Sequence, residues 1–148
     1  MRVAHGTVSC WAPELVITTY RENSLYVLLV RYEGGVEEFR GLWHIPGGYN
    51  NFSEPYFQTT CSAIAKRELG CDVCFVRPLG VHKWKDGEHP YGRPLSIYAE
   101  CQLRDLNEFR ESETVKFFPV EGLPLEVVGP HRRFLEAFYN RPGWQPRK

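Results

Sequence analysis

Long apolar runs are missing from this sequence. A run such as Tyr26 to Val30 has only the length of a strand, whereas a membrane-spanning helix needs roughly 18 or more consecutive apolar residues. The N-terminal residues also lack the apolar core of a secretory signal. We therefore expect a soluble, cytoplasmic protein with no membrane partner.

Net charge is absent as well, because 18 Lys and Arg residues balance 18 Asp and Glu residues. Bulk nucleic-acid binding draws on cationic side chains that neutralise phosphates, so we expect no nucleic-acid partner of this kind. Hydrophobic residues at 43% and aromatic residues at 14% are typical of a globular chain. The length of 148 residues predicts a single domain, residues 1–148, with one core.

Cysteines are few and odd in number. Five cysteines fit reduced thiols better than a disulfide framework. Cys71 and Cys74 have the Cys-x-x-Cys spacing, but a zinc or redox site would need a second ligand pair or a helix start at Cys71. Buried apolar thiols are the favoured interpretation. A zinc or thiol-redox protein is the alternative, and it requires bound metal or a shifted thiol pKa.

The spacing of apolar residues predicts the secondary structure. Runs of β-branched and apolar residues predict strands at 15–20, 25–30, 42–45, 73–81, 95–103 and 115–120. Residues 55–69 have the apolar spacing of an amphipathic helix, with a cap at Ser53 and a stop at Gly70. A second helix is expected from Gly129 to about Asn140. The order predicts an α+β fold in which a mixed β-sheet is sandwiched between helices.

Glu68 lies on the apolar side of the first predicted helix. At about 100° per residue it falls within about 20° of Phe57 on the apolar stripe, while Arg67 is expected to project elsewhere. A carboxylate on an inward face is costly unless something pairs with it. A divalent metal and a strand arginine, such as Arg31 or Arg77, are both suitable partners.

Gly48 and Glu54 are separated by five residues, and the helix that follows ends in Glu68, Leu69 and Gly70. With this spacing, the stretch from Trp43 to Gly70 resembles the box of the Nudix family, a loop–helix–loop that binds magnesium for hydrolysing nucleoside diphosphates linked to another group. Gly48, five further residues and then Glu54 match the first part of that box. The resemblance implies the Nudix fold and a Mg²⁺ cofactor, with Mn²⁺ as the other candidate metal. It also implies the metal ligands: Glu68, Glu54 and the carbonyl of Gly48.

The second half of the box departs from the family pattern. With one inserted residue, Glu68 and Gly70 align with the second acid and the glycine of the box. Arg67 then replaces the first acid, and Ala63 and Ile64 replace the Arg-Glu pair. A rival frame that aligns Arg67 and Glu68 with the Arg-Glu pair leaves no acids after it. A multi-metal cluster is therefore not expected, whereas one Mg²⁺ is feasible, because it takes one or two carboxylates, waters and substrate phosphates.

This reduced box is similar to that of the GDP-mannose mannosyl hydrolase branch, whose members use a histidine just before the C-terminal helix as general base. His131 matches that position by context, and an ordinary imidazole pKa near 6.5 suits a base at neutral pH. An exposed turn residue is the alternative for His131. The resemblance also implies that Arg31 faces a phosphate, and Trp43 and Tyr49 could either stack a nucleobase or pack in the core. The predicted catalytic residues are His131 and Glu68.

We therefore predict a Mg²⁺-dependent, Nudix-type hydrolase of a small nucleotide-type substrate, such as the nucleotide sugar GDP-mannose. A water activated by His131 would attack phosphorus or the anomeric carbon of the sugar. The alternative is a Nudix-fold nucleotide-binding module that has lost catalysis, which the missing acids favour. Aromatic residues near Trp144 could serve a homodimer.

Overall fold

Six strands and two α-helices make up the part of the chain that the computed structural model describes, residues 11–34, 37–48, 56–85, 87–89 and 95–140. The strands are β1 (Trp11–Arg21), β2 (Ser24–Arg31), β3 (Trp43–His44), β4 (Val73–Lys83), β5 (Leu95–Leu103) and β6 (Val115–Pro119). The helices are α1 (Phe57–Leu69) and α2 (Gly129–Tyr139), and two short 3-10 turns are η1 (Glu37–Phe39) and η2 (Val120–Gly122).

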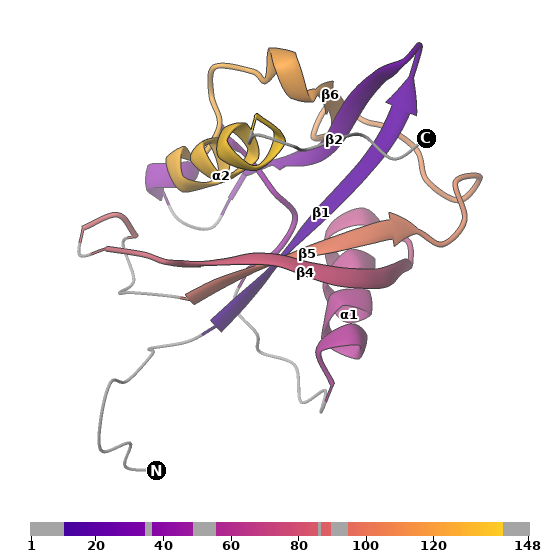
Figure 1. The fold of residues 1–148 in the computed structure, drawn as a ribbon, viewed down its shortest axis with the longest axis horizontal. Coiled ribbons are helices and arrows are strands. Elements are labelled where there is room, and N and C mark those ends of the chain that lie inside the picture. The colour runs from indigo at the N-terminus through magenta and orange to yellow at the C-terminus, as the bar shows by residue number, and fades with distance from the viewer. Residues whose placement is uncertain (1–10, 35–36, 49–55, 86, 90–94, 141–148) are drawn as a thin grey trace.

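The strands form a mixed sheet with β1 at its centre. Their order is β3-β2-β1-β5-β4, and β6 pairs with β2. Residues 11–17 of β1 run parallel to β5, while residues 18–21 run antiparallel to β2 (Figure 1). β1 therefore joins a parallel half of the sheet to an antiparallel half.

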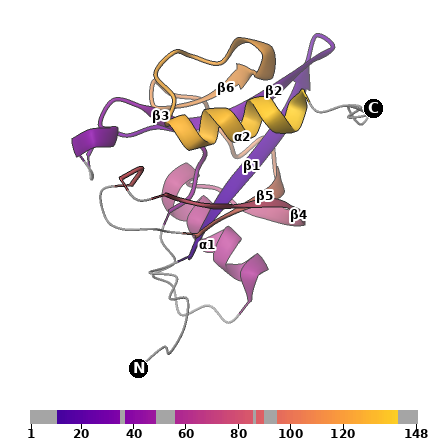
Figure 2. The same ribbon diagram turned by 60° about the vertical axis from the view of Figure 1, so that its left-hand side comes forward.

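The helices cover opposite faces of this sheet (Figure 2). Ile64 of α1 packs on the face that carries Leu15 and Ile17, whereas Leu135 of α2 packs on the face that carries Val16. Neighbouring residues of a strand point to opposite faces, so the apolar run of β1 supplies both cores. The predicted α+β fold, a mixed β-sheet sandwiched between helices, is confirmed.

The helix ends follow the predicted signals in part. Gly70 ends α1 with φ +70°, a left-handed conformation that favours glycine, and its N–H donates to the carbonyl of Lys66. α2 begins at Gly129 as predicted. The predicted cap, Ser53, lies outside the described residues. α1 begins at Phe57, later than the predicted start at residue 55, because Tyr56 before it has an extended backbone.

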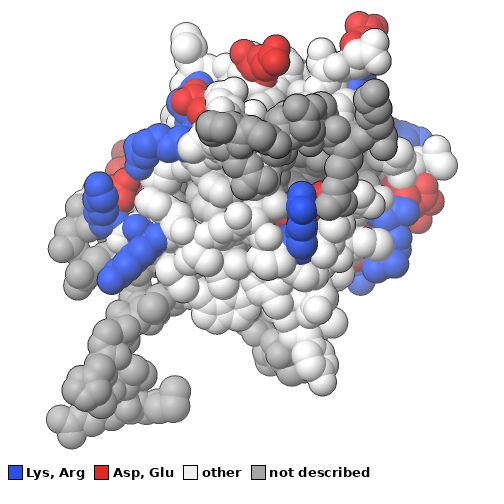
Figure 3. All heavy atoms as spheres, viewed as in Figure 1, with Lys and Arg blue, Asp and Glu red and all other residues white. Residues whose placement is uncertain are grey.

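The described surface carries charges of both signs. In Figure 3, small groups of basic and acidic side chains lie near one another around the edges of the face in view. Among the described residues, ion pairs join side chains of opposite charge, for example Arg77 with Glu100 and Arg104 with Asp72. Neither described helix is long and apolar enough to cross a membrane.

Candidate functional site

A tight turn after β3 brings two glycines against the central strand β1. We call residues 46–48 the glycine corner. The N–H of Gly48 donates to the carbonyl of Pro13 at 3.3 Å. A Cβ on Gly47 would collide with the Glu14 carboxylate and the Pro13 carbonyl, so this close approach requires glycine. The backbone of Gly48 has φ +137°, a conformation that also favours glycine.

The last turn of α1 lies against the glycine corner. The Nη2 atom of Arg67 donates to the carbonyl oxygen of Gly47 at 3.3 Å and to Oε1 of Glu68 at 3.2 Å. It also lies 3.3 Å from the place that a Cβ on Gly48 would take. Burial raises the pKa of Glu68, and the charge of Arg67 acts in the opposite direction. The structure thus brings the predicted residues Gly48 and Glu68 to one place.

The helix geometry predicted that Arg67 projects away from Glu68. In the structure its guanidinium instead contacts Glu68 and the glycine corner. Its long side chain reaches back along the helix end, because the half-buried carboxylate of Glu68 and the carbonyl of Gly47 attract a cation. The strand arginines proposed as partners of Glu68 have other partners: Arg77 pairs with Glu100, and Arg31 lies 3.7 Å from Glu33.

A second carboxylate, Glu14, lies on the other side of the glycine corner. It is only 5% exposed. The hydroxyl of Ser96 donates to its Oε1 at 3.2 Å, and the indole N–H of Trp84 donates to Ser96 at 2.8 Å. Burial is the main cause of the raised pKa of Glu68, and the charge of Glu14 adds to it. Glu14 was not among the predicted site residues. An acid at the start of an apolar strand is the feature of the sequence that could have indicated it, but only the fold shows what this carboxylate faces.

His131 lies in the first turn of α2 and is 4% exposed, so the interpretation as an exposed turn residue is wrong. Its Nδ1 accepts the backbone N–H of Ile45 at 3.0 Å. A nitrogen that accepts a hydrogen bond carries no proton, so the neutral ring holds its proton on Nε2. This Nε2 lies 3.7 Å from Oε1 of Glu14.

Aromatic rings and a second histidine surround His131. The ring centres of His44, Trp84 and Tyr98 lie 6.2–6.3 Å from that of His131. His44 is buried, and its Nδ1 lies 2.8 Å from the carbonyl of Ile45. Burial, reinforced by the charge of His131, lowers the pKa of His44 to about 3. His44 is therefore a neutral residue of the core at ordinary pH.

Arg31 and Trp43, the residues predicted to contact substrate, lie together on β2 and β3. The Arg31 guanidinium stands 5.6 Å from the centre of the Trp43 ring. Trp43 is 7% exposed and meets Phe118 edge to face at 4.7 Å. Of the two interpretations offered for Trp43, core packing is the one that its burial supports.

A divalent metal at the glycine corner would need several oxygen ligands that converge on one point. The described residues include no group of three His, Cys, Asp or Glu side chains that could hold a metal ion. Arg67 contacts both the Glu68 carboxylate and the Gly47 carbonyl, the kinds of oxygen that Mg²⁺ would bind. The described donor set therefore does not fit Mg²⁺ or Mn²⁺. Glu54 and Tyr49, also predicted for the site, lie outside the described residues.

The four described cysteines have the character of structural thiols. Cys61, Cys71, Cys74 and Cys101 are free, and all but the half-buried Cys74 are buried. Burial raises the pKa of Cys71, whereas a reactive thiol needs a lowered pKa. This supports the buried-thiol interpretation over the zinc or redox alternative.

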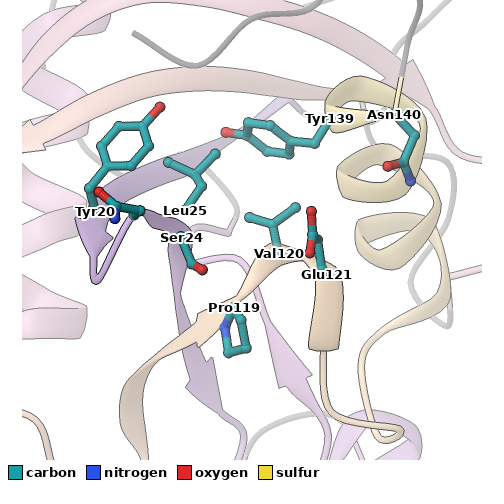
Figure 4. A pocket seen from close by; sticks show the side chains of 9 residues that line it. Tyr20, Ser24, Leu25, Pro119, Val120, Glu121, Tyr139 and Asn140 are labelled. Atoms are coloured by element: carbon teal, nitrogen blue, oxygen red, sulfur yellow. The ribbon is translucent and has the colours of Figure 1, made fainter. Parts of the chain in front are cut away.

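A separate pocket lies beside the turn between β1 and β2 (Figure 4). Its volume is about 170 Å³. Tyr20 and Leu25 of the hairpin, Val120 and Glu121 of η2, and Tyr139 of α2 contribute to its walls. The described residues predicted for the functional site, Gly48, Glu68, His131, Arg31 and Trp43, are not among those that line it.

Solved structures of other proteins share this architecture. Shewanella oneidensis NrtR superposes with a TM-score of 0.69 at 18% identity, over 90% of this chain and 63% of that chain. The NUDIX domain of that protein, solved in complex with ADP ribose, gives a TM-score of 0.66 at 19% identity, over 92% of this chain and 90% of that chain. This chain has the Nudix fold.

A UDP-X diphosphatase has the same fold, with a TM-score of 0.67 at 19% identity over 93% of this chain and 65% of that chain. This Nudix-fold chain thus spans less than two thirds of the length of NrtR and of the diphosphatase. No family model matches the sequence, and no curated protein sequence matches it. The likeness is one of fold, and function has to be argued from the site.

Proposed function

We propose that this Nudix-fold chain binds a nucleoside diphosphate linked to a second group, and that the glycine corner holds the diphosphate. The observation that carries this proposal is the contact between the Arg67 guanidinium and the backbone of Gly47. Glycines let a ligand approach the backbone closely, and a guanidinium recognises pairs of phosphate oxygens. ADP ribose, bound by the NrtR domain, and the UDP-X of the diphosphatase belong to this ligand class.

Hydrolysis of the same ligand is the second candidate function. It is favoured by the two carboxylates near the glycine corner, Glu14 beside Gly47 and Glu68 beside Arg67. A nucleotide sugar such as GDP-mannose remains the specific substrate proposed from the reduced box. In this candidate Mg²⁺ or Mn²⁺ would neutralise the diphosphate, with Glu68, Glu54 and the Gly48 carbonyl as its ligands. The contact between Arg67 and Glu68 favours the binding function over this one.

The general base of such a hydrolase would be His131 or Glu14. His131 remains the base proposed from the sequence, and it would have to release the N–H of Ile45 to accept a proton at Nδ1. Glu14 is the alternative, because the proton on Nε2 of His131 faces its carboxylate. In that arrangement His131 is a positioning residue.

Arg31 is the remaining candidate for a ligand contact. Its side chain is 37% exposed beside the buried Trp43, so it could reach a phosphate from the β2 side. Tyr49 is still proposed to stack a nucleobase.

A ligand panel tests both candidates. Isothermal titration calorimetry measures binding of ADP-ribose, UDP-glucose, GDP-mannose, a dinucleotide and ATP, and chromatography of the same mixtures measures hydrolysis over a Mg²⁺ titration. Binding of the diphosphate-linked compounds without turnover supports the binding function. Turnover that depends on Mg²⁺ supports the hydrolase, and absence of binding to every compound overturns the proposal.

A further inference from the structure

The pocket beside the turn between β1 and β2, which we call the hairpin pocket, has no part in the proposed function. We propose that it binds a small organic ammonium ion, such as a quaternary ammonium compound. Its volume of about 170 Å³ is close to the roughly 150 Å³ of a cavity that holds one benzene molecule. The inference goes beyond the proposed function, because it concerns another site and another class of ligand.

An aromatic ring forms one wall of the hairpin pocket (Figure 4). Tyr20 and Leu25 are paired directly across β1 and β2, so their side chains lie side by side on one face of the sheet. This is the face that α2 covers, because Tyr20 alternates in step with Val16. Tyr20 is 44% exposed, so a ligand can reach its ring. The face of an aromatic ring attracts a cation, and quaternary ammonium ions are recognised in this way.

The side-chain charge of the hairpin pocket is negative. Glu121 of η2 is the one charged residue among the described residues that line it. None of the ion pairs among the described residues includes this carboxylate. Glu22, exposed in the adjacent turn, adds a second negative charge. An unpaired carboxylate beside an aromatic ring selects a cation over an anion or a neutral molecule.

The end of α2 favours the same charge. Tyr139 is the last residue of α2, and both it and the following Asn140 line the hairpin pocket. The C-terminal end of a helix carries a partial negative charge, which a nearby cation offsets. The last turn of α2, all of which is described, contains no basic residue to do so. The helix end, the carboxylate of Glu121 and the ring of Tyr20 thus act in the same direction.

The turn itself holds polar groups at the rim of the hairpin pocket. Glu22 and Asn23 have φ +50° and φ +68°, as in the two-residue turns that match the twist of a hairpin. Positive φ is common for asparagine but uncommon for glutamate. Asn23 and Ser24 line the pocket and can form hydrogen bonds to a polar end of the ligand. A hydroxylated ammonium compound such as choline therefore suits the pocket as a probe.

The experiment titrates choline into the isotope-labelled protein and follows the backbone amide signals by nuclear magnetic resonance. The uncharged analogue of choline, in which a carbon atom replaces the quaternary nitrogen, is titrated in parallel. We expect choline to shift the signals of residues 20–25 and 119–121 and to bind about fivefold more tightly than the analogue. Equal affinities for the two compounds, or shifts confined to other residues, would overturn the proposal.

Four variants assign the binding to these groups. Tyr20→Leu removes the ring and should weaken choline binding about two- to fivefold, whereas Tyr20→Phe keeps the ring and should bind like the wild type. Glu121→Gln should weaken binding by a similar factor of about two to five. Glu126→Gln is the matched control, because Glu126 is also exposed but does not line the hairpin pocket. Unchanged affinity in Tyr20→Leu and Glu121→Gln, or equal losses in Glu121→Gln and Glu126→Gln, contradicts the proposal.

The next residue of the chain, Arg141, lies outside the described residues. If the wild type binds no choline and Arg141→Gln gains binding, a cation of the chain itself competes for the hairpin pocket, and the proposal of an external ligand is wrong. Absence of choline binding in both proteins overturns it as well. None of these results depends on nucleotide binding, so failure of the proposed function is recognised separately, by the nucleotide panel.

Discussion

Nε2 of His131 lies 3.7 Å from Oε1 of Glu14, although the two residues are far apart in the sequence and belong to α2 and β1. The opposite ring nitrogen accepts the N–H of Ile45 at 3.0 Å. This hydrogen bond assigns the proton of the neutral ring to the nitrogen that faces the carboxylate. His131 thus connects α2 to the turn after β3 and to the central strand.

The buried contacts of His131 predict a structural effect of its removal. His131→Ala leaves the N–H of Ile45 without its acceptor and opens a buried cavity under the first turn of α2. We therefore expect the free energy of unfolding to fall by about 2–4 kcal/mol. Urea unfolding at neutral pH measures this. His131→Asn can place its amide oxygen near the former Nδ1 and should recover part of the loss. A change under about 0.5 kcal/mol in His131→Ala would contradict the buried arrangement.

The lowered pKa of His44 predicts a loss of stability in acid. Its pKa is about 3 in the folded protein and near 6.5 in an unfolded chain. Between these values the unfolded chain binds the additional proton, so the free energy of unfolding falls as pH decreases from about 6.5 towards 3. At about 1.4 kcal/mol per pH unit, this group alone contributes about 2 kcal/mol of loss by pH 5.

Urea unfolding at pH 7 and pH 5 measures the effect, with His44→Phe as the comparison. Phenylalanine keeps an aromatic ring beside Tyr32, whose ring stacks on His44 at 3.6 Å, but it cannot titrate. We expect the variant to lose less stability than the wild type between the two pH values. The same loss in both proteins would show that His44 is not responsible.

Gly47 is the position where a side chain is least tolerated at the candidate site. A Cβ there would collide with the backbone carbonyl of Pro13, which cannot move without disturbing β1. We expect Gly47→Ala to lower the free energy of unfolding by about 3 kcal/mol, as for other overpacked sites. Gly34→Ala is the matched control, since a Cβ at Gly34 meets nothing within 4 Å. Thermal unfolding of both variants compares them, and equal midpoints would disprove the close approach.

Substitutions of Trp43 test whether its ring packs in the core or stacks on a ligand. Because Trp43 is 7% exposed against Phe118, we expect Trp43→Ala to lower the free energy of unfolding by about 3–5 kcal/mol. Trp43→Phe should retain most of the stability and leave ADP-ribose affinity unchanged. A large loss of affinity in Trp43→Phe, with unfolding unaffected, would instead indicate a stacked nucleobase.

The elements of the fold could be predicted because they depend on local patterns. The helical spacing after residue 55, the glycine stop at Gly70 and the start of α2 at Gly129 are each encoded within a few residues. The apolar run at residues 15–20 predicted a strand, and the structure shows that helices on either side of the sheet bury both of its faces. Glu68 could likewise be placed on the inward side from helix geometry alone.

The sequence by itself therefore determined the α+β fold, the helix that carries Glu68 and the glycines of the corner. Only the tertiary structure decided the partners of the charged groups. It set Glu14 beside His131, and it turned Arg67 towards Gly47 and Glu68. Helical periodicity fixes the direction in which a side chain leaves the backbone, but a long, flexible side chain follows the electrostatic field. That field depends on residues that only the fold brings together.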